Sequence, residues 1–343
     1  MEARALAQFT APKGPLSSLG HSSSISVPEL LYHSVDDHVL IFEDLGPLVT
    51  LPEYLTGFSD DNANTNPETC RRIGARVGEF FAKLHSPESL RQVRSATSDD
   101  LENHLIKDLV LQAAVMPVKG YLARYEIPNA QELFSRVFAD YQRVTSPAEL
   151  CFVLGDFTPG AVLTAASGDG EQPVGIIDWE FSGVGRGPNG DMAQCLASLH
   201  LSLMAALPGS RSHGAIKSLI QGVCSSYYQH SREWHEKGTA SVAEEPKAHA
   251  LVVANLHLQI FRSALILHGR EMINNAIERE WPGSPQKEST ILVKEMVQKG
   301  AWYIERARDD VRGMLEAANW DELLVEDDRI MLSLFGIETQ LSS

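Results

Sequence analysis

Two short apolar stretches near the middle of the chain, each next to an aspartate, most constrain how this sequence can fold. The stretches AVL and VGII are separated by the polar loop AASGDGEQP, which is typical of a β-hairpin. Antiparallel pairing across that loop sets Val162 opposite Ile176 and brings Ala161 close to Asp178. Asp156 lies just before the first strand. We therefore expect the carboxylates of Asp156 and Asp178, 22 residues apart in the sequence, to meet at one end of the hairpin.

Two carboxylates held close together need a proton, a cation or distance between them. Oxygen ligands suit magnesium, so the spacing predicts a divalent metal site. The plainer interpretation is that each aspartate is a turn or capping residue at the end of a strand. The spacing alone leaves both interpretations open.

The charge of the chain argues against several classes of partner. It has 29 Lys and Arg against 45 Asp and Glu, a formal net charge of −16. Such a charge repels phosphate backbones and anionic lipid headgroups, so we expect neither nucleic-acid binding nor membrane binding. A cationic small-molecule substrate would suit it.

The cysteines and the apolar stretches predict a cytoplasmic protein. The four cysteines have no CxxC spacing, which argues against a zinc knuckle and a disulfide framework. The longest apolar stretch, from Met192 to Leu207, is interrupted by polar residues and falls short of the roughly 20 residues that span a bilayer. The first residues also lack the pattern of a secretory signal.

Most of the remaining chain has helical periodicity. Ile73, Val77, Phe80, Phe81 and Leu84 fall on one helical face and predict a helix that stops before Pro87. Other helices are expected over 1–9, 101–115, 130–143, 191–207, 214–230, 249–268 and 289–318.

Turn and strand signals divide these helices. Two short strands are expected over 29–33 and 38–43, joined at Asp36 and Asp37. Gly269 is expected to terminate the helix over 249–268. Loops are expected over 10–26, 231–248 and 281–290.

Several polar residues on these helices have simple structural interpretations. Asp191 precedes an apolar-periodic helix, which predicts an N-cap rather than a catalytic role. His85 ends a helix, where interaction with the last carbonyl groups is expected. His200 and His257 lack further ligands at suitable spacing, so we expect no metal there.

Five segments together resemble one family. FVLGDFTPGAVL and VGIIDWEFSGVGRGPNGDMAQ resemble the catalytic segment of the aminoglycoside phosphotransferase and choline kinase superfamily, HGDxxxxN followed by an IDxE or IDW strand end. ARVGEFFAKLHS and VPELLYHSVDDHVLIFEDLG resemble its LGxxLAxLHS helix and its fourth and fifth strands. EARAL at the start resembles its third helix. The closest motifs are those of methylthioribose kinases and related fungal small-molecule kinases.

The resemblance implies a role for each matching residue. Asp156 would be the catalytic base, and Asp178 would bind the magnesium held by the phosphates of ATP. Glu180 matches a further acidic position and would touch the metal; otherwise it is an exposed residue at a strand end. Glu43, Asp44 and Leu45 match the hinge, whose backbone would hydrogen-bond adenine.

The sequence departs from the family pattern at two positions in the catalytic segment. Leu154 replaces the histidine that steadies the catalytic loop, and Ala161 replaces the asparagine expected five residues after the catalytic aspartate. Alanine has no oxygen to offer a metal. Glu180 or water is expected to compensate.

The resemblance also implies a protein-kinase-like α+β fold with a reduced N-lobe. The third helix would lie at Glu2, so the given sequence lacks the three strands before it, with their phosphate loop and lysine, and the edge of the remaining sheet would be exposed. Residues 1–46 would form the β-containing N-lobe. Residues 47–343 would form a mainly α-helical C-lobe with the catalytic hairpin at 151–181.

Two interpretations of function follow. In the first, the protein transfers the γ-phosphate of ATP, with Mg²⁺, to a hydroxyl group of a small molecule, or is the remnant of such a kinase encoded farther upstream. In the second, it is an inactive kinase-fold protein that binds a ligand or a partner. A third is that a partner chain supplies the missing strands.

Overall fold

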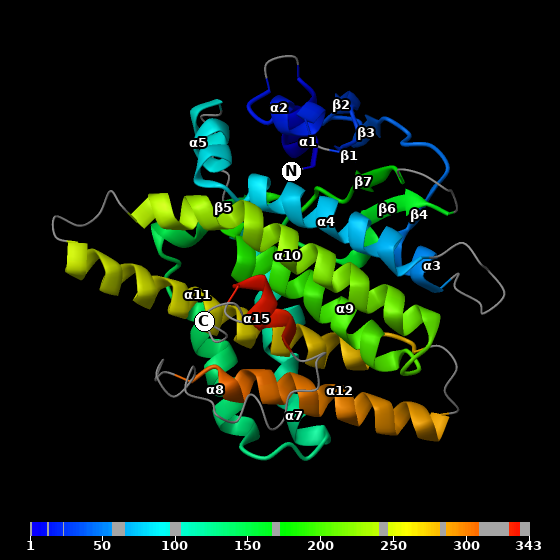
Figure 1. Cartoon of the computed structure of the whole chain (residues 1–343), viewed down its shortest axis with the longest axis vertical. Helices are drawn as coiled ribbons and strands as arrows, with labels where there is room; N and C mark the ends of the chain where they lie inside the picture. Colours follow the sequence, from blue (N-terminus) through cyan, green and yellow to red (C-terminus); the bar gives the residue numbers. More distant parts are fainter. Residues whose placement is uncertain are drawn as a thin grey trace.

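The computed structural model describes residues 2–11, 14–22, 24–56, 66–96, 104–166, 172–239, 246–281, 286–308 and 329–336. A few short strands lie at one end of a much larger helical body (Figure 1). The fold is therefore α+β, which confirms the predicted class.

The N-terminal elements combine two helices with a hairpin. They are α1 (Glu2–Thr10), α2 (Ser17–Ser22), β1 (Ile25–Ser26), β2 (Leu30–Ser34) and β3 (Val39–Phe42). The predicted hairpin is confirmed, since β2 and β3 pair antiparallel. The expected loop over 10–26 was wrong, because Leu16, Leu19 and Ile25 are buried in the core and fix α2 and β1 in place.

The β2–β3 hairpin keeps much of its apolar surface exposed. Tyr32 and Ile41 are 52% and 48% exposed, and Leu31 and Phe42 are also exposed. Its two strands pair only with each other in the described part of the chain.

A second sheet holds the predicted central hairpin. Its strands are β4 (Leu48–Thr50), β6 (Val162–Ala165) and β7 (Val174–Ile176), with β1 added parallel to β7. Val162 pairs with Ile176, as predicted. Beside it, β5 (Leu150–Val153) pairs with β8 (Gly183–Arg186), so both sides of the catalytic segment enter strands.

The helical body follows the apolar periodicity. The remaining elements are α3 (Leu51–Thr56), α4 (Pro67–Leu84), α5 (Pro87–Ala96), α6 (His104–Val110), η1 (Leu111–Val115), α7 (Pro117–Arg124), α8 (Ala130–Gln142), η2 (Pro147–Glu149), η3 (Pro159–Ala161), η4 (Gly187–Met192), α9 (Ala193–Ala205), α10 (Arg211–Thr239), α11 (Pro246–Glu278), α12 (Gln286–Arg306) and α15 (Ile330–Leu334). In the described part of the chain, no helix is long and apolar enough to cross a membrane.

Three predicted boundaries in this body were wrong. Helix α11 continues through Gly269, because this glycine lies against Gly300 of α12 and serves close helix packing instead of termination. Helix α10 extends to Thr239, so residues 231–239 are not a loop. Helix α12 begins at Gln286, inside the loop expected over 281–290.

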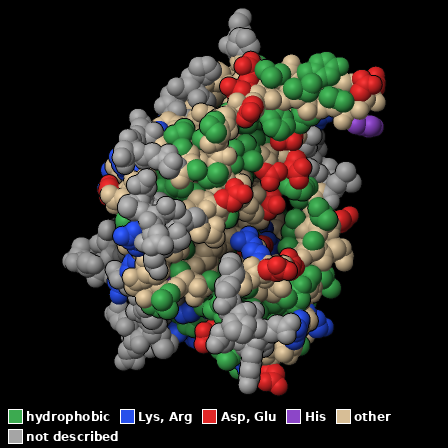
Figure 2. All heavy atoms as spheres, turned by 90° about the vertical axis from the view of Figure 1, so that its right-hand side faces the viewer, with side chains coloured by type: hydrophobic (Ala, Val, Ile, Leu, Met, Phe, Trp, Pro, Cys, Tyr) green, Lys and Arg blue, Asp and Glu red, His purple; other side chains and the backbone are tan. Residues whose placement is uncertain are grey.

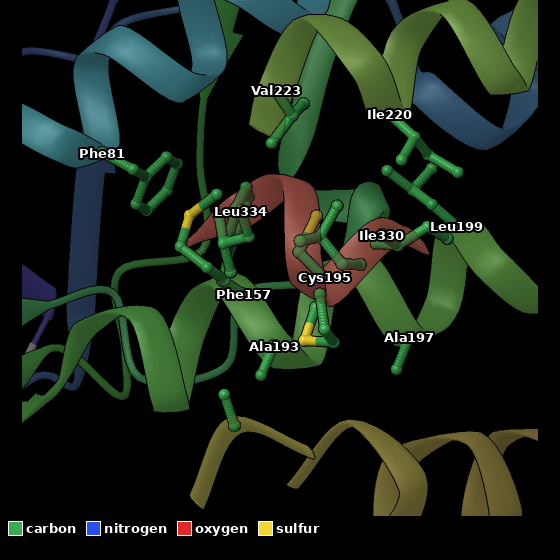
Figure 3. Close-up of a cluster of buried hydrophobic side chains, with 14 of the residues drawn as sticks. Phe81, Phe157, Ala193, Cys195, Ala197, Leu199, Ile220, Val223, Ile330 and Leu334 are labelled. Atoms are coloured by element: carbon green, nitrogen blue, oxygen red, sulfur yellow. The ribbon is translucent and has the colours of Figure 1, made fainter. Parts of the chain in front are cut away.

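One continuous core joins these helices. Figure 3 shows Ile330 and Leu334 of α15 near Cys195 of α9 and Ile220 and Val223 of α10. All five side chains are at most 5% exposed. The four cysteines are buried and free, as expected of small apolar residues.

Helices α4 and α10 pack closely because glycines line their contact. A Cβ atom on Gly222 of α10 would lie 2.1 Å from the carbonyl oxygen of Arg71, and one on Gly74 of α4 would lie 2.2 Å from that of Leu219. These distances are too short for any side chain. The separation of the two helices therefore depends on glycine at these positions.

We predict that Gly222→Ala lowers the free energy of unfolding by about 1–3 kcal/mol, because α4 must move away from α10. Gly214→Ala is the matched control, since Gly214 lies in the same helix and no atom would touch its Cβ within 4 Å. The control should be neutral or gain up to about 1 kcal/mol. Urea unfolding measures both, and equal effects would contradict the packing argument.

Two histidines form a buried neutral pair. His268 Nδ1 lies 3.2 Å from the carbonyl oxygen of Ala193, so it donates there and its Nε2 accepts from His200 Nδ1, also at 3.2 Å. Burial lowers the pKa of His268 to about 3 and the pKa of His200 well below its usual value. In this arrangement both ring nitrogens of His268 and Nδ1 of His200 are engaged in these hydrogen bonds.

This pair should make stability depend on pH. Because both pKa values are depressed in the folded state, the unfolded chain binds more protons, and stability falls as the pH drops below about 6.5. The loss is at most about 1.4 kcal/mol per pH unit for each histidine. In urea unfolding between about pH 7 and pH 5, the free energy of unfolding of His268→Gln should depend less on pH than that of the wild type. The exposed control His33→Gln should keep the wild-type slope, and an unchanged slope in His268→Gln would refute this explanation.

Candidate active site

The loop that carries Asp156 follows strand β5 and turns sharply at Gly155. The φ angle of Gly155 is +96°, and a Cβ there would lie 2.1 Å from the carbonyl oxygen of Phe181. Only glycine fits this conformation and this close approach. The turn lets the loop leave β5 and reach the start of β6.

Asp191 anchors this loop through its backbone. Its carboxylate accepts hydrogen bonds from the N–H groups of Leu154, at 2.8 Å, and Gly155, at 3.0 Å. The carboxylate is also 3.2 Å from His85 Nε2, and His85 Nδ1 is 3.0 Å from the hydroxyl of Tyr227. All of these side chains are buried.

These contacts correct two predictions from the sequence. Asp191 does not cap α9, because the chain is already helical through the π-helical turn η4 and enters α9 without a side-chain cap. His85 does not use its ring on the last carbonyls of α4 but binds Asp191 and Tyr227. Sequence spacing gave no sign that either residue reaches a loop formed elsewhere in the chain.

Apolar packing holds the other side of the loop. Phe157 stacks on Phe81 of α4, with ring centroids 3.9 Å apart, and both are fully buried. Leu154, which replaces the histidine of the family pattern, is also fully buried. The loop is thus steadied by its backbone contacts with Asp191 and by packing, rather than by a polar side chain at position 154.

Asp156 itself lies partly buried beside α9. The side-chain amide of Gln194 donates a hydrogen bond to its Oδ1. Burial raises the pKa of Asp156, Gln194 opposes this, and the negative charges of Glu271, Asp178 and Asp191 raise it further. A raised pKa brings the carboxylate closer to the range useful for a general base.

The hairpin brings Asp178 toward Asp156. The N–H of Ile177 donates to the carbonyl oxygen of Ala161 at 3.0 Å, which continues the strand pairing to the level expected from the sequence. The negative charge of Asp178 is one of the causes that raise the pKa of Asp156, after burial. The strand pairing that the sequence predicted is confirmed, and the joint binding site of the two carboxylates stays a prediction.

The backbone at Asp178 is strained. Its φ angle is +71°, which is rare for residues other than glycine. The following Trp179 is fully buried, lies against Phe9 in a tilted arrangement with ring centroids 4.6 Å apart, and donates from Nε1 to the carbonyl oxygen of Ile176. The turn therefore buries Trp179 while the Asp178 side chain is exposed.

Glu2 and Glu180 extend the acidic site toward α1. The N–H of Trp179 hydrogen-bonds to the Glu2 carboxylate. Burial raises the pKa of Glu2, the Trp179 bond lowers it, and the charges of Asp178 and Glu180 raise it. The charge of Asp178 thus acts on both Asp156 and Glu2, and the Glu180 side chain is exposed. Glu2 was missed as a site residue because it lies far away in sequence and its helix position alone gave no signal.

These carboxylates suit a cation bound together with phosphate. Figure 2 shows acidic side chains gathered around a hollow that also holds basic ones. Among the described residues, no group of three or more His, Cys, Asp and Glu side chains could hold a metal by itself. Magnesium, however, commonly uses only one or two carboxylates and completes its coordination with phosphates and water. Asp178 and Glu180 fit that pattern.

The predicted hinge lies next to the hairpin. The N–H of Glu43 donates to the carbonyl oxygen of Glu29, and Asp44 Oδ1 accepts from the N–H of Gly46. Leu45 rests on Gly175 of β7, where a Cβ would lie 2.7 Å from Leu45 Cδ1. The glycine therefore lets the hinge approach the strand that leads to Asp178.

We predict that Asp191→Asn lowers the free energy of unfolding by about 1–3 kcal/mol, because its one oxygen cannot accept both loop N–H groups. Its NH₂ group would face one of these donors and leave it unsatisfied. Asp108→Asn is the control, because it removes the same charge at an exposed position on α6. Its free energy of unfolding should be nearly that of the wild type. Chemical denaturation measures both, and an unaffected Asp191→Asn protein would show that the anchor is dispensable.

Comparison with known proteins gives two curated relatives, both named 4-hydroxytryptamine kinase. The one from Psilocybe cubensis is 25% identical over 171 residues, which cover 47% of this chain and 44% of the relative. The one from Psilocybe cyanescens is 39% identical over 72 residues, which cover 20% of this chain and 19% of the relative. The chain therefore matches less than half the length of either.

Solved structures give similar, distant matches. A choline/ethanolamine kinase family protein from Mesorhizobium loti is 11% identical, with a TM-score of 0.37 over 95% of this chain and 84% of that one. Choline kinase from Cryptosporidium parvum is 13% identical, with a TM-score of 0.38 over 91% of this chain and 82% of that one.

The family model described as the phosphotransferase enzyme family matches residues 2–186. The matched region runs from α1 through the anchored loop and the hairpin to the end of β8. Since it covers more than half of the sequence, the chain belongs to the phosphotransferase enzyme family.

Proposed function

We propose that this protein transfers the γ-phosphoryl group of ATP to a hydroxyl group of a small molecule. The observation that supports the proposal is the register of the central hairpin, which ends with Asp178 following β7 and Asp156 preceding β6, and the charge of Asp178 raises the pKa of Asp156. Phosphoryl transfer needs two things there: a group that orients the attacking hydroxyl and a charge that neutralises the phosphates. The two aspartates offer one group for each task.

In this proposal Asp156 binds the acceptor hydroxyl and takes its proton. The hydroxyl oxygen forms a bond to the γ-phosphorus while the bond to the bridging oxygen breaks, and ADP leaves. The proton remains on Asp156 until it passes to solvent. Burial, and to a lesser extent the surrounding acids, raise the pKa of Asp156, which makes it a stronger base than an exposed aspartate.

Asp178 and Glu180 would hold Mg²⁺, which neutralises charge on the phosphates when bound. Ala161 supplies no oxygen here, since its side chain is a buried methyl group. Glu180, exposed beside Asp178, is the side chain proposed to compensate for the missing asparagine.

The adenine would lie between the hinge and the hairpin. Backbone groups of Glu43, Asp44 and Leu45 would make its hydrogen bonds, and contact between Leu45 and Gly175 keeps this segment near the metal site. We propose residues 1–46 as a reduced N-lobe and residues 47–343 as the C-lobe on this basis.

The first acceptor to test is a hydroxylated amine. Both curated relatives are named for 4-hydroxytryptamine, and an acidic site on a chain of net charge −16 favours a cation. Sugars, amino alcohols and aminoglycosides are the other classes to include.

A second candidate function is ligand binding without transfer. Ala161 favours it, because the position offers no metal ligand and its carbonyl oxygen is already used by the N–H of Ile177. Binding of Mg²⁺ and ATP without phosphorylation of any acceptor would support this alternative.

We predict that Mg²⁺ with ATP raises the melting temperature of the wild-type protein, and that Asp178→Asn removes most of this shift. Asp36→Asn is the control, because it removes one negative charge, as Asp178→Asn does, at an exposed position in the β2–β3 turn. This variant should keep the shift in melting temperature. Glu180→Gln should weaken the magnesium dependence. A shift that survives Asp178→Asn, or unchanged magnesium affinity in Glu180→Gln, would contradict the assigned metal roles.

We predict that Asp156→Asn lowers kcat by about 10²–10⁴-fold while ATP binding persists, because only the acceptor hydroxyl depends on it. Transfer of labelled phosphate to 4-hydroxytryptamine and the other acceptors measures this. In the wild type, activity should fall as the pH drops through the raised pKa of Asp156. Equal activity in Asp156→Asn would remove the proposed base.

A further inference from the structure

Gln194 is the side chain that directly contacts the proposed base. It lies in the first turn of α9 and donates from Nε2 to Asp156 Oδ1. The reverse orientation of the amide would place its oxygen against the carboxylate, which is unfavourable. The Gln194 side chain therefore turns its NH₂ group toward Asp156, and its hydrogen bond occupies Oδ1 of that carboxylate.

The other carboxylate oxygen remains available. Among the described residues, no group donates a hydrogen bond to Asp156 Oδ2. The hydrogen bond from Gln194 to Oδ1 restricts the rotation of the carboxylate. Oδ2 is then the atom that can meet a hydroxyl group.

The segment that carries Gln194 is itself held in place. Asp191, three residues earlier, binds the backbone of Leu154 and Gly155. The carbonyl oxygen of Ala193 accepts a hydrogen bond from buried His268. One short segment thus holds both the backbone before Asp156 and the side chain of Asp156, and α11 holds that segment.

The charges around Asp156 act against its ionised form. Glu271 faces it from α11, Asp178 from the end of β7 and Asp191 from η4, and each raises its pKa. Arg279, just after α11, is the nearby cation, and its Nη2 donates to Ser198 Oγ at 3.1 Å. Gln194 provides a neutral donor directly on the carboxylate, and this contact lowers the pKa of Asp156.

We propose that Gln194 is a positioning residue for phosphoryl transfer: by occupying Oδ1 of Asp156 it aims Oδ2 at the acceptor hydroxyl. This inference rests on the proposed function of Asp156. It adds a requirement that the family motif does not contain, namely a hydrogen-bond donor at the fourth position of the segment Asp191–Gln194.

The test compares Gln194→Leu with wild type by two independent measurements. NMR titration of ¹³C-labelled aspartates, with the Asp156 signal assigned by its absence in Asp156→Asn, reports the contact without any substrate. Asp156 should titrate at higher pH in Gln194→Leu. In the phosphotransfer assay kcat should fall by up to about 100-fold with little change in the KM for ATP, and the acidic limb of the pH profile should move to higher pH.

Gln142→Leu is the matched control, an exposed glutamine at the end of α8, and should match wild type in both measurements. Gln194→Glu keeps the shape of the side chain but replaces the donor with a second acid. It should raise the pKa of Asp156 at least as much as Gln194→Leu does. If Asp156 titrates as in wild type in a folded Gln194→Leu protein, the positioning role is refuted. If the titration moves but no acceptor is phosphorylated by wild type, the contact stands and the proposed function fails.

Discussion

The candidate site depends most on the buried carboxylate of Asp191. Two N–H groups of the loop before Asp156 point at it, and each would be unsatisfied without it. Burying an ionised carboxylate is costly unless hydrogen bonds surround it. The loop N–H groups and His85 provide those bonds. The buried Asp191 carboxylate therefore needs the loop in this conformation, and the loop needs Asp191 to satisfy its N–H groups.

The position of Asp191 is fixed in turn by a buried ionic network. Arg143, at the end of α8, donates to both oxygens of Glu149, at 2.8 and 2.5 Å. Glu149 also accepts from Asn189, which lies two residues before Asp191 in η4. A paired Arg and carboxylate of this kind is stronger and more directional than a neutral contact. The helical body thereby determines where the loop that carries Asp156 lies.

The sequence was sufficient for the parts of the site that local patterns control. The hairpin register followed from alternating apolar residues and a polar loop, and the structure confirms it at Val162 and Ile176. The contacts of His85, Asp191 and Gln194 could not be predicted in this way, because each depends on how distant helices pack. Gly269 shows the same limit: a glycine near a helix end resembles a terminator, but here its lack of a side chain serves contact with another helix.

The acidic residues around Asp178 explain why a neutral donor suits the proposed base. Asp178 raises the pKa of both Asp156 and Glu2, so a cation bound at Asp178 would favour the ionised form of each. A lysine or arginine in place of Gln194 would also keep Asp156 ionised, but its positive charge would stabilise the carboxylate so strongly that it became a poor proton acceptor. An amide orients the same oxygen by a hydrogen bond and adds no net charge. Gln194 of α9 thus orients the carboxylate and partly offsets the rise in the pKa of Asp156 that burial and the surrounding acids cause.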